Sequence, residues 1–210
     1  MKEINERKWN QQRAFTLVEL AIVLVIVGLL LGGVLKGQAM IDSARMKRAI
    51  QDYKNISAAV LTYRDQYKSW PGDDNRAQTL LGNTTLLNGD GDGRVDGSYA
   101  SSDDTNESRQ FWYHLRAADM VTGSSADTAG GTLLPSNPWG GQTGVTSSAI
   151  SGFALGEANT LCYGLVPGDA SRNIDTQLDD GVPTTGKVRG HASDTSYDAS
   201  SNYTLCLVIG

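Results

Sequence analysis

The sequence predicts an α+β protein that consists of one long N-terminal helix and a loop-rich head. An apolar run covers residues 15–35, and apolar residues then recur at three- and four-residue intervals as far as Tyr67. Strand-forming segments separated by turn residues follow in the C-terminal half. We therefore divide the 210 residues into a basic leader (1–14), a membrane-spanning helix (15–35), its amphipathic continuation (36–68) and a globular head (69–210).

The apolar run is long enough to cross a membrane. It has 21 residues, and about 20 apolar residues span the hydrocarbon as a helix. The basic residues that precede it are Lys2, Arg7, Lys8 and Arg13. Basic flanks stay on the cytoplasmic side, so we expect the head on the far side of the membrane. The alternatives are a signal peptide cut after Gly37-Gln38-Ala39 and a permanent single-pass anchor.

Glu19 is the one charged residue inside the apolar run. A carboxylate in hydrocarbon costs on the order of 3 kcal/mol and usually marks a partner. If the chain were cut before Phe15, a new α-amino group would arise there. On a neighbouring copy, that cation could neutralise Glu19. The alternative is a carboxylate near the membrane surface that is protonated or reaches water.

The helix is expected to continue beyond the apolar run. Residues 36–68 contain no proline and a single glycine, Gly37. One helical face carries Ile50, Tyr53, Ile56, Val60, Tyr63 and Tyr67. Trp70-Pro71-Gly72 then ends the helix. The alternative is two helices with a hinge at Gly32-Gly33 or at Gly37.

The N-terminal segment Arg13-Ala14-Phe15-Thr16-Leu17-Val18-Glu19-Leu20 resembles the prepilin signature of type IV pilins and of the pseudopilins of type II secretion. The resemblance implies cleavage by a prepilin peptidase between Ala14 and Phe15, N-methylation of Phe15, and a role for Glu19 in filament assembly. It also implies a type IV pilin-like fold, in which the long helix packs on an antiparallel sheet. Ala14 departs from the pattern, because the family usually has glycine before the cut.

The function that the resemblance implies is that of a structural filament subunit. Such a chain would lie in the inner membrane first, with its head in the periplasm. An assembly platform would then add it to other pilins in an extracellular or periplasmic filament. The alternatives are a pseudopilin of a type II secretion system and a minor tip pilin that binds a surface. We expect no enzyme, because the only histidines, His114 and His191, belong to no recognisable nucleophilic or zinc constellation.

The head is acidic. Residues 69–210 contain 17 Asp and Glu against 7 Lys and Arg, a formal charge of −10. A surface of this sign repels phosphate backbones, so bulk nucleic-acid binding is not expected. The same acidity would also serve solubility alone.

Residues 88–96 are similar to a calcium-binding loop of the EF-hand type. The predicted ligands are the side chains of Asn88, Asp90, Asp92 and Asp96 and the carbonyl of Arg94. Gly93 occupies the position where such a loop turns sharply. Tyr99 stands where that loop has glutamate, so Asp103 or Asp104 would have to substitute. The alternative is an acidic, glycine-rich turn without metal.

Cys162 and Cys206 are the only cysteines. An even number in an exported head predicts one disulfide, and two buried free thiols are the alternative. Both lie in predicted strands, and many pilins have a disulfide near the C-terminus.

A helix, three strands and a polar turn are also expected in the head. Residues 106–120 read as a helix, in which Trp112 and His114 have packing or surface roles. Residues 153–155, 161–166 and 203–209 read as strands. The segment 174–181, which ends in Asp179-Asp180-Gly181, is expected to be a polar turn, with a second oxygen-rich site as the alternative.

Overall fold

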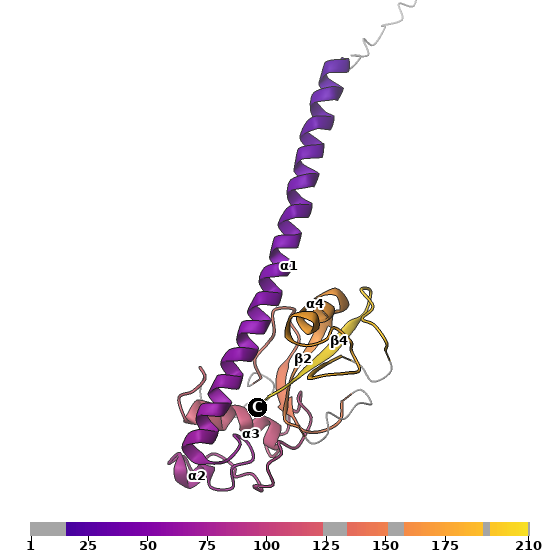
Figure 1. Cartoon of the computed structure of the whole chain (residues 1–210). Helices are drawn as coiled ribbons and strands as arrows, with labels where there is room; N and C mark the ends of the chain where they lie inside the picture. The colour runs from indigo at the N-terminus through magenta and orange to yellow at the C-terminus, as the bar shows by residue number, and fades with distance from the viewer. Residues whose placement is uncertain (1–15, 124–133, 151–157, 191–193, 210) are drawn as a thin grey trace, which may run out of the picture. The chain divides into compact units, whose positions relative to one another are not determined.

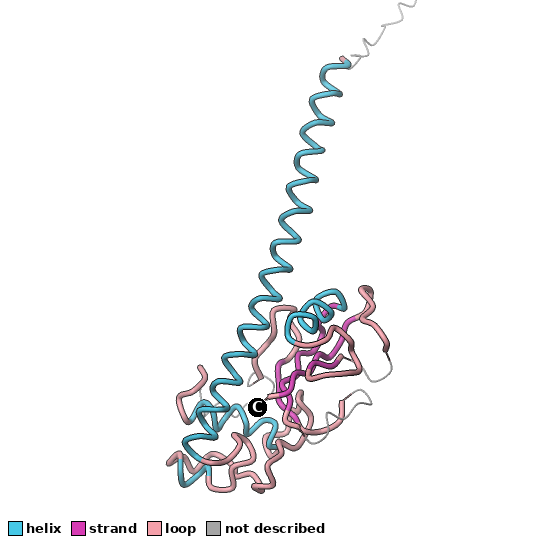
Figure 2. Tube along the Cα trace, in the orientation of Figure 1, coloured by secondary structure: helices cyan, strands magenta, loops and turns pink. Residues whose placement is uncertain are grey.

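The computed structural model describes residues 16–123, 134–150, 158–190 and 194–209. It contains two compact units, Met1–Asp42 and Ser43–Gly210. Helices and one antiparallel sheet make up the regular structure (Figure 1), so the predicted α+β class is confirmed. Much of the second unit is loop (Figure 2), as its richness in turn-forming residues predicts.

Helix α1, Leu17–Tyr67, is continuous over 51 residues. It passes through Gly32-Gly33 and Gly37 without a break, so the alternative of two hinged helices is wrong. A glycine weakens a helix by about 1 kcal/mol relative to alanine but keeps both backbone hydrogen bonds. The helix ends where Lys68 takes a left-handed conformation, with φ of 59°. Trp70 and Pro71 follow, and proline cannot donate the next backbone hydrogen bond.

The C-terminal part of α1 belongs to the second unit and contributes to its core. Val60 and Tyr63 are fully buried, and Tyr53 and Ile56 are packed against the same core. Hydrogen bonds join this part of α1 to the sheet. Tyr163 Oη donates to a carbonyl of α1 at 3.0 Å, and Tyr53 Oη donates to a carbonyl of the C-terminal strand at 2.7 Å. The predicted apolar face of this segment is therefore the face that packs on the head.

The sheet has the strand order β1-β2-β4-β3, and all of its neighbouring strands are antiparallel. The strands are β1 (Thr143–Thr146), β2 (Thr160–Pro167), β3 (Val188–Arg189) and β4 (Asn202–Val208). The strands predicted over 161–166 and 203–209 are confirmed as β2 and β4, whereas β1 and β3 were not predicted. The strand predicted over 153–155 lies outside the described residues.

Three shorter helices complete the second unit: α2 (Ala77–Leu80), α3 (Glu107–Ala117) and α4 (Gly168–Leu178). Helix α3 confirms the helix predicted over 106–120. Helix α4 corrects the turn predicted over 174–181, because only residues 179–181 follow its last turn. The segment is polar, but Ser171, Ile174 and Asp175 share one buried face, and that burial supports a helix.

The core of the second unit is shared by α1, α3, α4 and the sheet. Its fully buried large side chains include Tyr63, Phe111, Trp112, Leu115, Leu161, Tyr163, Ile174 and Leu205. The ring of Phe111 meets that of Trp112 edge to face, with centroids 5.2 Å apart. Leu86 and Val95 also belong to this core, which thereby holds the loops between α1 and α3 that carry the predicted metal ligands.

Candidate functional site

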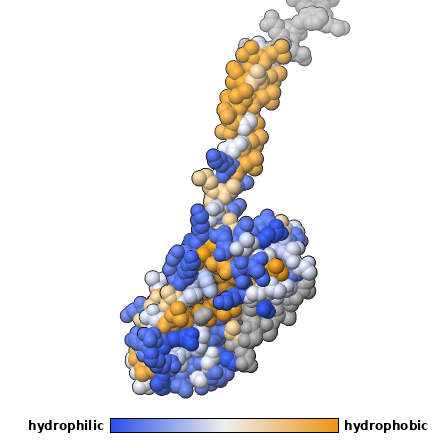
Figure 3. Space-filling view, viewed as in Figure 1, coloured by the Kyte–Doolittle hydropathy of each residue, from blue (hydrophilic) through white to orange (hydrophobic). Residues whose placement is uncertain are grey.

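The first half of α1 is an apolar surface. Leu17 is 86% exposed, and Leu24 and Leu29 are more than 70% exposed. The most apolar window of 18 residues in this helix has a mean hydropathy of 2.8 and no buried share, so by length and composition the helix could cross a membrane. Figure 3 shows the N-terminal part of α1 as a mostly hydrophobic surface. Apolar surface of this extent is unfavourable in water and requires an apolar environment.

The first turn of α1 is capped by Thr16 and Glu19. Thr16 Oγ1 accepts a hydrogen bond from the Glu19 N–H at 3.2 Å, and the Thr16 N–H donates to Glu19 Oε2 at 2.9 Å. This reciprocal pair is a capping box, and it places the carboxylate at the positive end of the helix dipole. Each oxygen of a carboxylate can accept more than one hydrogen bond, so Glu19 keeps acceptor sites with which it can bind a cation. Ala14 and Phe15, the predicted cleavage residues, lie outside the described residues.

The loop at residues 88–96 is folded around carboxylates. Asp73 accepts the N–H of Gly91 at 2.7 Å and that of Gly93 at 2.9 Å. Glu107 accepts the N–H of Asp90 and that of Asp96, at 2.9 and 3.0 Å. Gly91 and Gly93 have φ of 83° and 92°, a conformation that favours glycine. The sharp turn predicted at Gly93 is therefore confirmed.

Three carboxylates meet beside this loop. One oxygen from each of Asp73, Asp90 and Asp92 lies within 4.8 Å of the other two. Asp73 is 1% exposed. Its burial, together with the charges of Asp92 and Asp90, raises its pKa to about 6, although two N–H donors act in the opposite direction. Like charges held this close favour a bound cation, and carboxylate oxygens are what calcium prefers.

Two of the other predicted ligands have partners elsewhere. Asn88 Oδ1 accepts the N–H of Gln78 at 2.9 Å, and Asp96 Oδ1 accepts the hydroxyl of Ser147 at 3.1 Å. Arg94 contacts the cluster through its backbone N–H, which donates to Asp92 Oδ1 at 2.8 Å. Of the three carboxylates predicted as ligands, the structure thus brings together Asp90 and Asp92, and it adds Asp73.

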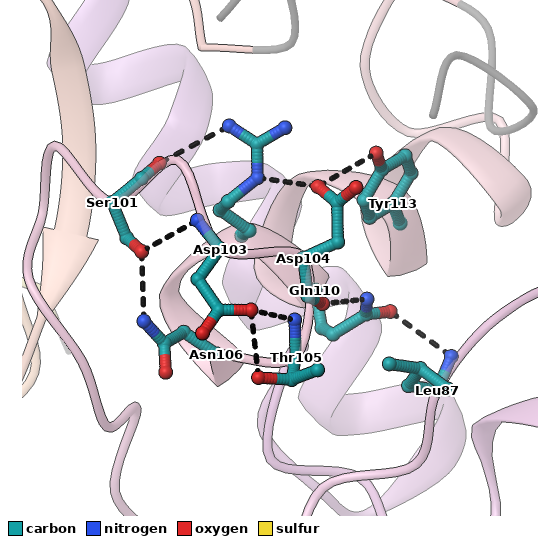
Figure 4. A network of polar contacts seen from close by, with 9 residues as sticks. Leu87, Ser101, Asp103, Asp104, Thr105, Asn106, Gln110 and Tyr113 are labelled. Atoms are coloured by element: carbon teal, nitrogen blue, oxygen red, sulfur yellow. Dashed lines mark hydrogen bonds and ion pairs between the residues drawn. The ribbon is translucent and has the colours of Figure 1, made fainter. Parts of the chain in front are cut away.

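Asp103 and Asp104, the suggested substitutes for the missing glutamate, belong to a separate polar network (Figure 4). Asp103 Oδ1 accepts the N–H and the hydroxyl of Thr105. Asp104 Oδ1 accepts Arg109 Nε at 2.6 Å and the Tyr113 hydroxyl at 3.3 Å. Arg109 is fully buried, so this pair anchors α3 to the preceding loop.

Asp73 and Glu107 were not predicted as part of this site. Asp73 follows the Pro71-Gly72 turn, and Glu107 stands in the first turn of α3. Neither has a spacing that relates it to the 88–96 loop. Their contacts with the loop join residues that are distant in the sequence, so they become visible only in the folded structure.

A second acidic cluster consists of Asp175, Asp179 and Asp180. Asp175 is fully buried and accepts the Tyr197 hydroxyl at 2.7 Å. Asp179 accepts the backbone N–H groups of Lys187 and Val188. These contacts tie the end of α4 to β3, and they account for the cluster as a structural feature.

The predicted disulfide between Cys162 and Cys206 is present. The two cysteines are direct partners across β2 and β4, and both are fully buried. Tyr99 and Ile150 pack against the two cysteines. The alternative of two free thiols is therefore wrong, and the bond joins the C-terminal strand to its neighbour.

His114 has a packing role. It is fully buried, and its Nδ1 accepts the N–H of Gly72 at 2.8 Å. Nδ1 must therefore lack a proton, so Nε2 carries the hydrogen and donates to the Leu87 carbonyl at 2.8 Å. Burial lowers the pKa of His114, which keeps the ring neutral. The ring joins α3 to two loops.

Comparison with known proteins identifies the N-terminal segment. Residues 9–35 match the family described as the prokaryotic N-terminal methylation motif. No curated protein matches the chain. Among solved structures, the chain is similar to the major type IV pilin PilA1 from Clostridium difficile, with 13% identity and a TM-score of 0.42. The match covers 80% of this chain and 96% of that chain. Similarity this low supports no inference about function, so the motif is the finding that bears on it.

Proposed function

We propose that this chain, which carries the N-terminal methylation motif of the type IV pilin and pseudopilin family, is a structural subunit of a type IV pilus-like filament. It is made as a precursor, and a prepilin peptidase cuts it between Ala14 and Phe15. The new N-terminus at Phe15 is then methylated. An inner-membrane assembly platform adds the processed chain to a filament of the same or related subunits.

The observation that supports this proposal is the exposed apolar half of α1. Burying one leucine contributes about 1.5–3 kcal/mol, and Leu17, Leu24 and Leu29 are all largely exposed. Lipid covers this surface before assembly, when the basic leader faces the cytoplasm and the head lies in the periplasm. A bundle of identical helices covers it afterwards. The helix leaves the membrane only because the bundle replaces the lipid.

Glu19 sets the register of the bundle in this proposal. The methylated amino group of Phe15 on one subunit neutralises Glu19 of its neighbour. In the unassembled chain, the carboxylate is held by Thr16 at the start of α1. Assembly therefore adds a cation to a carboxylate that is already fixed in position.

Mass spectrometry of the mature N-terminus tests the processing step. Filaments sheared from cells should contain chains that begin with methylated Phe15. Chains that retain residues 1–14 in such filaments would contradict the proposal, as would a soluble mature chain that begins after Ala39.

Two substitutions test the role of Glu19. Glu19→Ala should insert into the membrane normally and form no filaments, because the neighbouring amino group loses its partner. Thr16→Ala is the matched control, because it removes the cap and keeps the carboxylate, and it should still assemble. Normal filaments from Glu19→Ala would show that the carboxylate does not direct assembly.

Within this family we favour a pilus subunit over a secretion pseudopilin. A large head tied by the Cys162–Cys206 bond supports a pilus subunit, whereas the calcium-like loop is the feature that favours a pseudopilin. Deleting the gene separates the two functions. Loss of surface fibres is expected, and loss of an exported enzyme with fibres intact would indicate the pseudopilin. A minor tip pilin would be present in a few copies per fibre rather than along its length.

We also propose that the cluster of Asp73, Asp90 and Asp92 binds calcium. The close approach of their oxygens and the buried position of Asp73 support this proposal. A cation there relieves the repulsion among the carboxylates and stabilises the loop between α1 and α3. A ligand that binds only the folded state at one hundred times its Kd adds about 2.7 kcal/mol of stability.

Thermal unfolding of the full chain in detergent tests the calcium proposal. Millimolar calcium should raise the melting temperature relative to excess chelator, and Asp90→Asn with Asp92→Asn should remove the difference. Asp169→Asn is the control, since its side chain is 68% exposed and lies outside the cluster. A melting temperature that calcium leaves unchanged would exclude the site.

A further inference from the structure

Four tripeptides of the sequence have the form Asn-x-Ser or Asn-x-Thr, with a residue other than proline in the middle. This form is the acceptor pattern for N-linked glycans, which occur on surface loops of exported proteins. A glycan is large and hydrophilic, so the asparagine that carries it must face solvent and be accessible to an enzyme. The four acceptor tripeptides lie within the described residues and begin at Asn55, Asn83, Asn106 and Asn202.

The tripeptides at Asn55 and Asn106 do not meet these requirements. Asn55 lies within α1, where residues two positions apart do not face each other. The hydroxyl oxygen of Ser57 therefore points away from the amide of Asn55, and it is buried. Asn106 directly precedes α3, and its Nδ2 donates to Ser101 Oγ at 2.7 Å. Ser108, the third residue of that tripeptide, is fully buried in α3. The folded helices thus withhold both tripeptides from an enzyme.

The tripeptide at Asn202 is part of strand β4. Asn202 pairs with Pro167 of β2, so its backbone is held in the sheet. Residues two positions apart in a strand share a face but are about 7 Å apart along the chain. Thr204 accordingly makes its contact elsewhere, and its Oγ1 lies 3.4 Å from the Tyr99 hydroxyl. This tripeptide would reach an enzyme only if the end of β4 left the sheet.

The tripeptide Asn83-Thr84-Thr85 lies in an exposed turn that follows α2. The N–H of Leu86 donates to the Asn83 carbonyl at 3.4 Å and closes the turn. Thr84 and Thr85 are exposed, and Asn83 is partly exposed. Gly82 precedes the tripeptide with φ of 62°, and a Cβ atom there would meet no described atom beyond its chain neighbours within 4 Å. Open space therefore adjoins the asparagine.

The hydroxyl of this tripeptide contacts the amide of its asparagine. Thr85 Oγ1 donates to Asn83 Oδ1 at 2.7 Å, and the Thr85 N–H donates to the same oxygen at 3.0 Å. Both hydrogen bonds go to the amide oxygen, so they fix the orientation of the amide. Among the four acceptor tripeptides, this one combines an exposed turn with a hydroxyl that contacts the asparagine.

We propose that the head is N-glycosylated at Asn83 by an enzyme of the compartment into which it is exported. The donor is a sugar diphosphate carried by a lipid, because a lipid carrier can bring an activated sugar across the membrane. The amide Nδ2 of Asn83 attacks C1 of the sugar. The N–C1 bond forms, the bond from C1 to the diphosphate oxygen breaks, and the lipid diphosphate leaves. One amide proton passes to a base of the enzyme, and nothing is oxidised or reduced.

Peptide mapping by mass spectrometry tests the modification. The full chain is extracted by detergent from the membranes of its own cells and cut with trypsin. Arg76 and Arg94 bound the peptide 77–94, which contains Asn83 and none of the other three acceptor tripeptides. This peptide should carry the added mass of a glycan, and fragmentation should place that mass on Asn83. An unmodified peptide 77–94 from wild-type cells would overturn the proposal.

Substitutions within the turn show whether the tripeptide directs the modification. Asn83→Gln should remove the added mass, and so should Thr85→Ala, which keeps the asparagine and deletes only the hydroxyl and its hydrogen bond. Thr85→Ser keeps the hydroxyl and should retain the glycan. Thr84→Ala is the matched control, because it alters an exposed threonine of the same turn and preserves the acceptor pattern. Added mass that survives Asn83→Gln or Thr85→Ala would contradict the assignment.

The outcomes separate this inference from the proposed function. The inference depends on the export of the head, as proposed above, and not on the assembly of filaments. Filaments built from chains that are unmodified at Asn83 would refute the glycan and leave the filament function intact. A glycan at Asn83 on chains that never form filaments would support this inference and refute the filament function. Formation of the Cys162–Cys206 bond in each variant shows that its head is folded.

Discussion

Removing the disulfide should measure how much the C-terminal strand depends on its covalent bond to β2. The proposed change is Cys162→Ala with Cys206→Ala in the full chain, held in detergent micelles. The two cysteines are 44 positions apart in the sequence. Closing a loop of this length in the unfolded chain removes entropy equivalent to about 4 kcal/mol at 25 °C. The double variant should therefore lose about 4 kcal/mol of unfolding free energy.

The same loss can be expressed as a melting temperature. For a unit the size of Ser43–Gly210, each kcal/mol corresponds to roughly 2–4 °C. The melting temperature of the double variant should thus fall by roughly 10 °C. Part of any change could come from the lost volume of two buried side chains, because both cysteines are fully buried. Wild-type protein reduced under the same conditions keeps that volume and isolates the effect of the bond.

Urea unfolding followed by tryptophan fluorescence is a suitable assay, since Trp112 lies in the core. The urea midpoint should fall while the protein still unfolds in one transition. A double variant within 1 kcal/mol of the wild type would refute the reasoning. That result would mean that β2 and β4 hold the strand in place without the bond.

Three further predictions concern other buried polar groups. Because burial lowers the pKa of His114, the unfolded chain takes up its proton first. The contribution of His114 to the free energy of unfolding is thus complete above about pH 6.5 and is lost as the pH falls below that value. His114→Asn should remove this pH dependence, as measured by urea titrations across pH 5–8. Tyr163→Phe deletes a buried hydrogen bond to α1 and should lower the unfolding free energy by about 1 kcal/mol at unchanged m-value. Asp104→Asn leaves the buried Arg109 without its carboxylate partner. Because Asp104 is partly exposed, this substitution should lower the free energy of unfolding by about 2 kcal/mol. The exposed Asp103→Asn is the control.

The sequence was sufficient for the elements whose signals are local. Helix α1 follows from an apolar run and from regular spacing within one segment, and both can be read without a partner. Strands β2 and β4 follow from runs of β-favouring residues between turn residues. The Thr16 and Glu19 capping box is equally local, although the partner predicted for Glu19 lay in another chain.

The sequence was insufficient where the structure depends on distant partners. Strand β3 has two residues and exists because Val188 and Arg189 pair with β4. Strand β1 contains Gly144, which lies so close to Tyr99 that a side chain there would overlap its carbonyl. Such a requirement is visible only after the fold is known. Asp73 joined the carboxylate cluster for the same reason, because its contacts come from a loop farther along the chain.

The order of the strands has a consequence for synthesis. Strand β4 is the last of the described strands in the sequence, yet it occupies an interior position, with β2 on one side and β3 on the other. The described sheet cannot close until residues 202–208 have been synthesised, although α1 is complete long before. A nascent chain that ends between α1 and β4 therefore has a complete helix and a β2 strand without its neighbour. Chains that stop before residue 202 should remain sensitive to proteases.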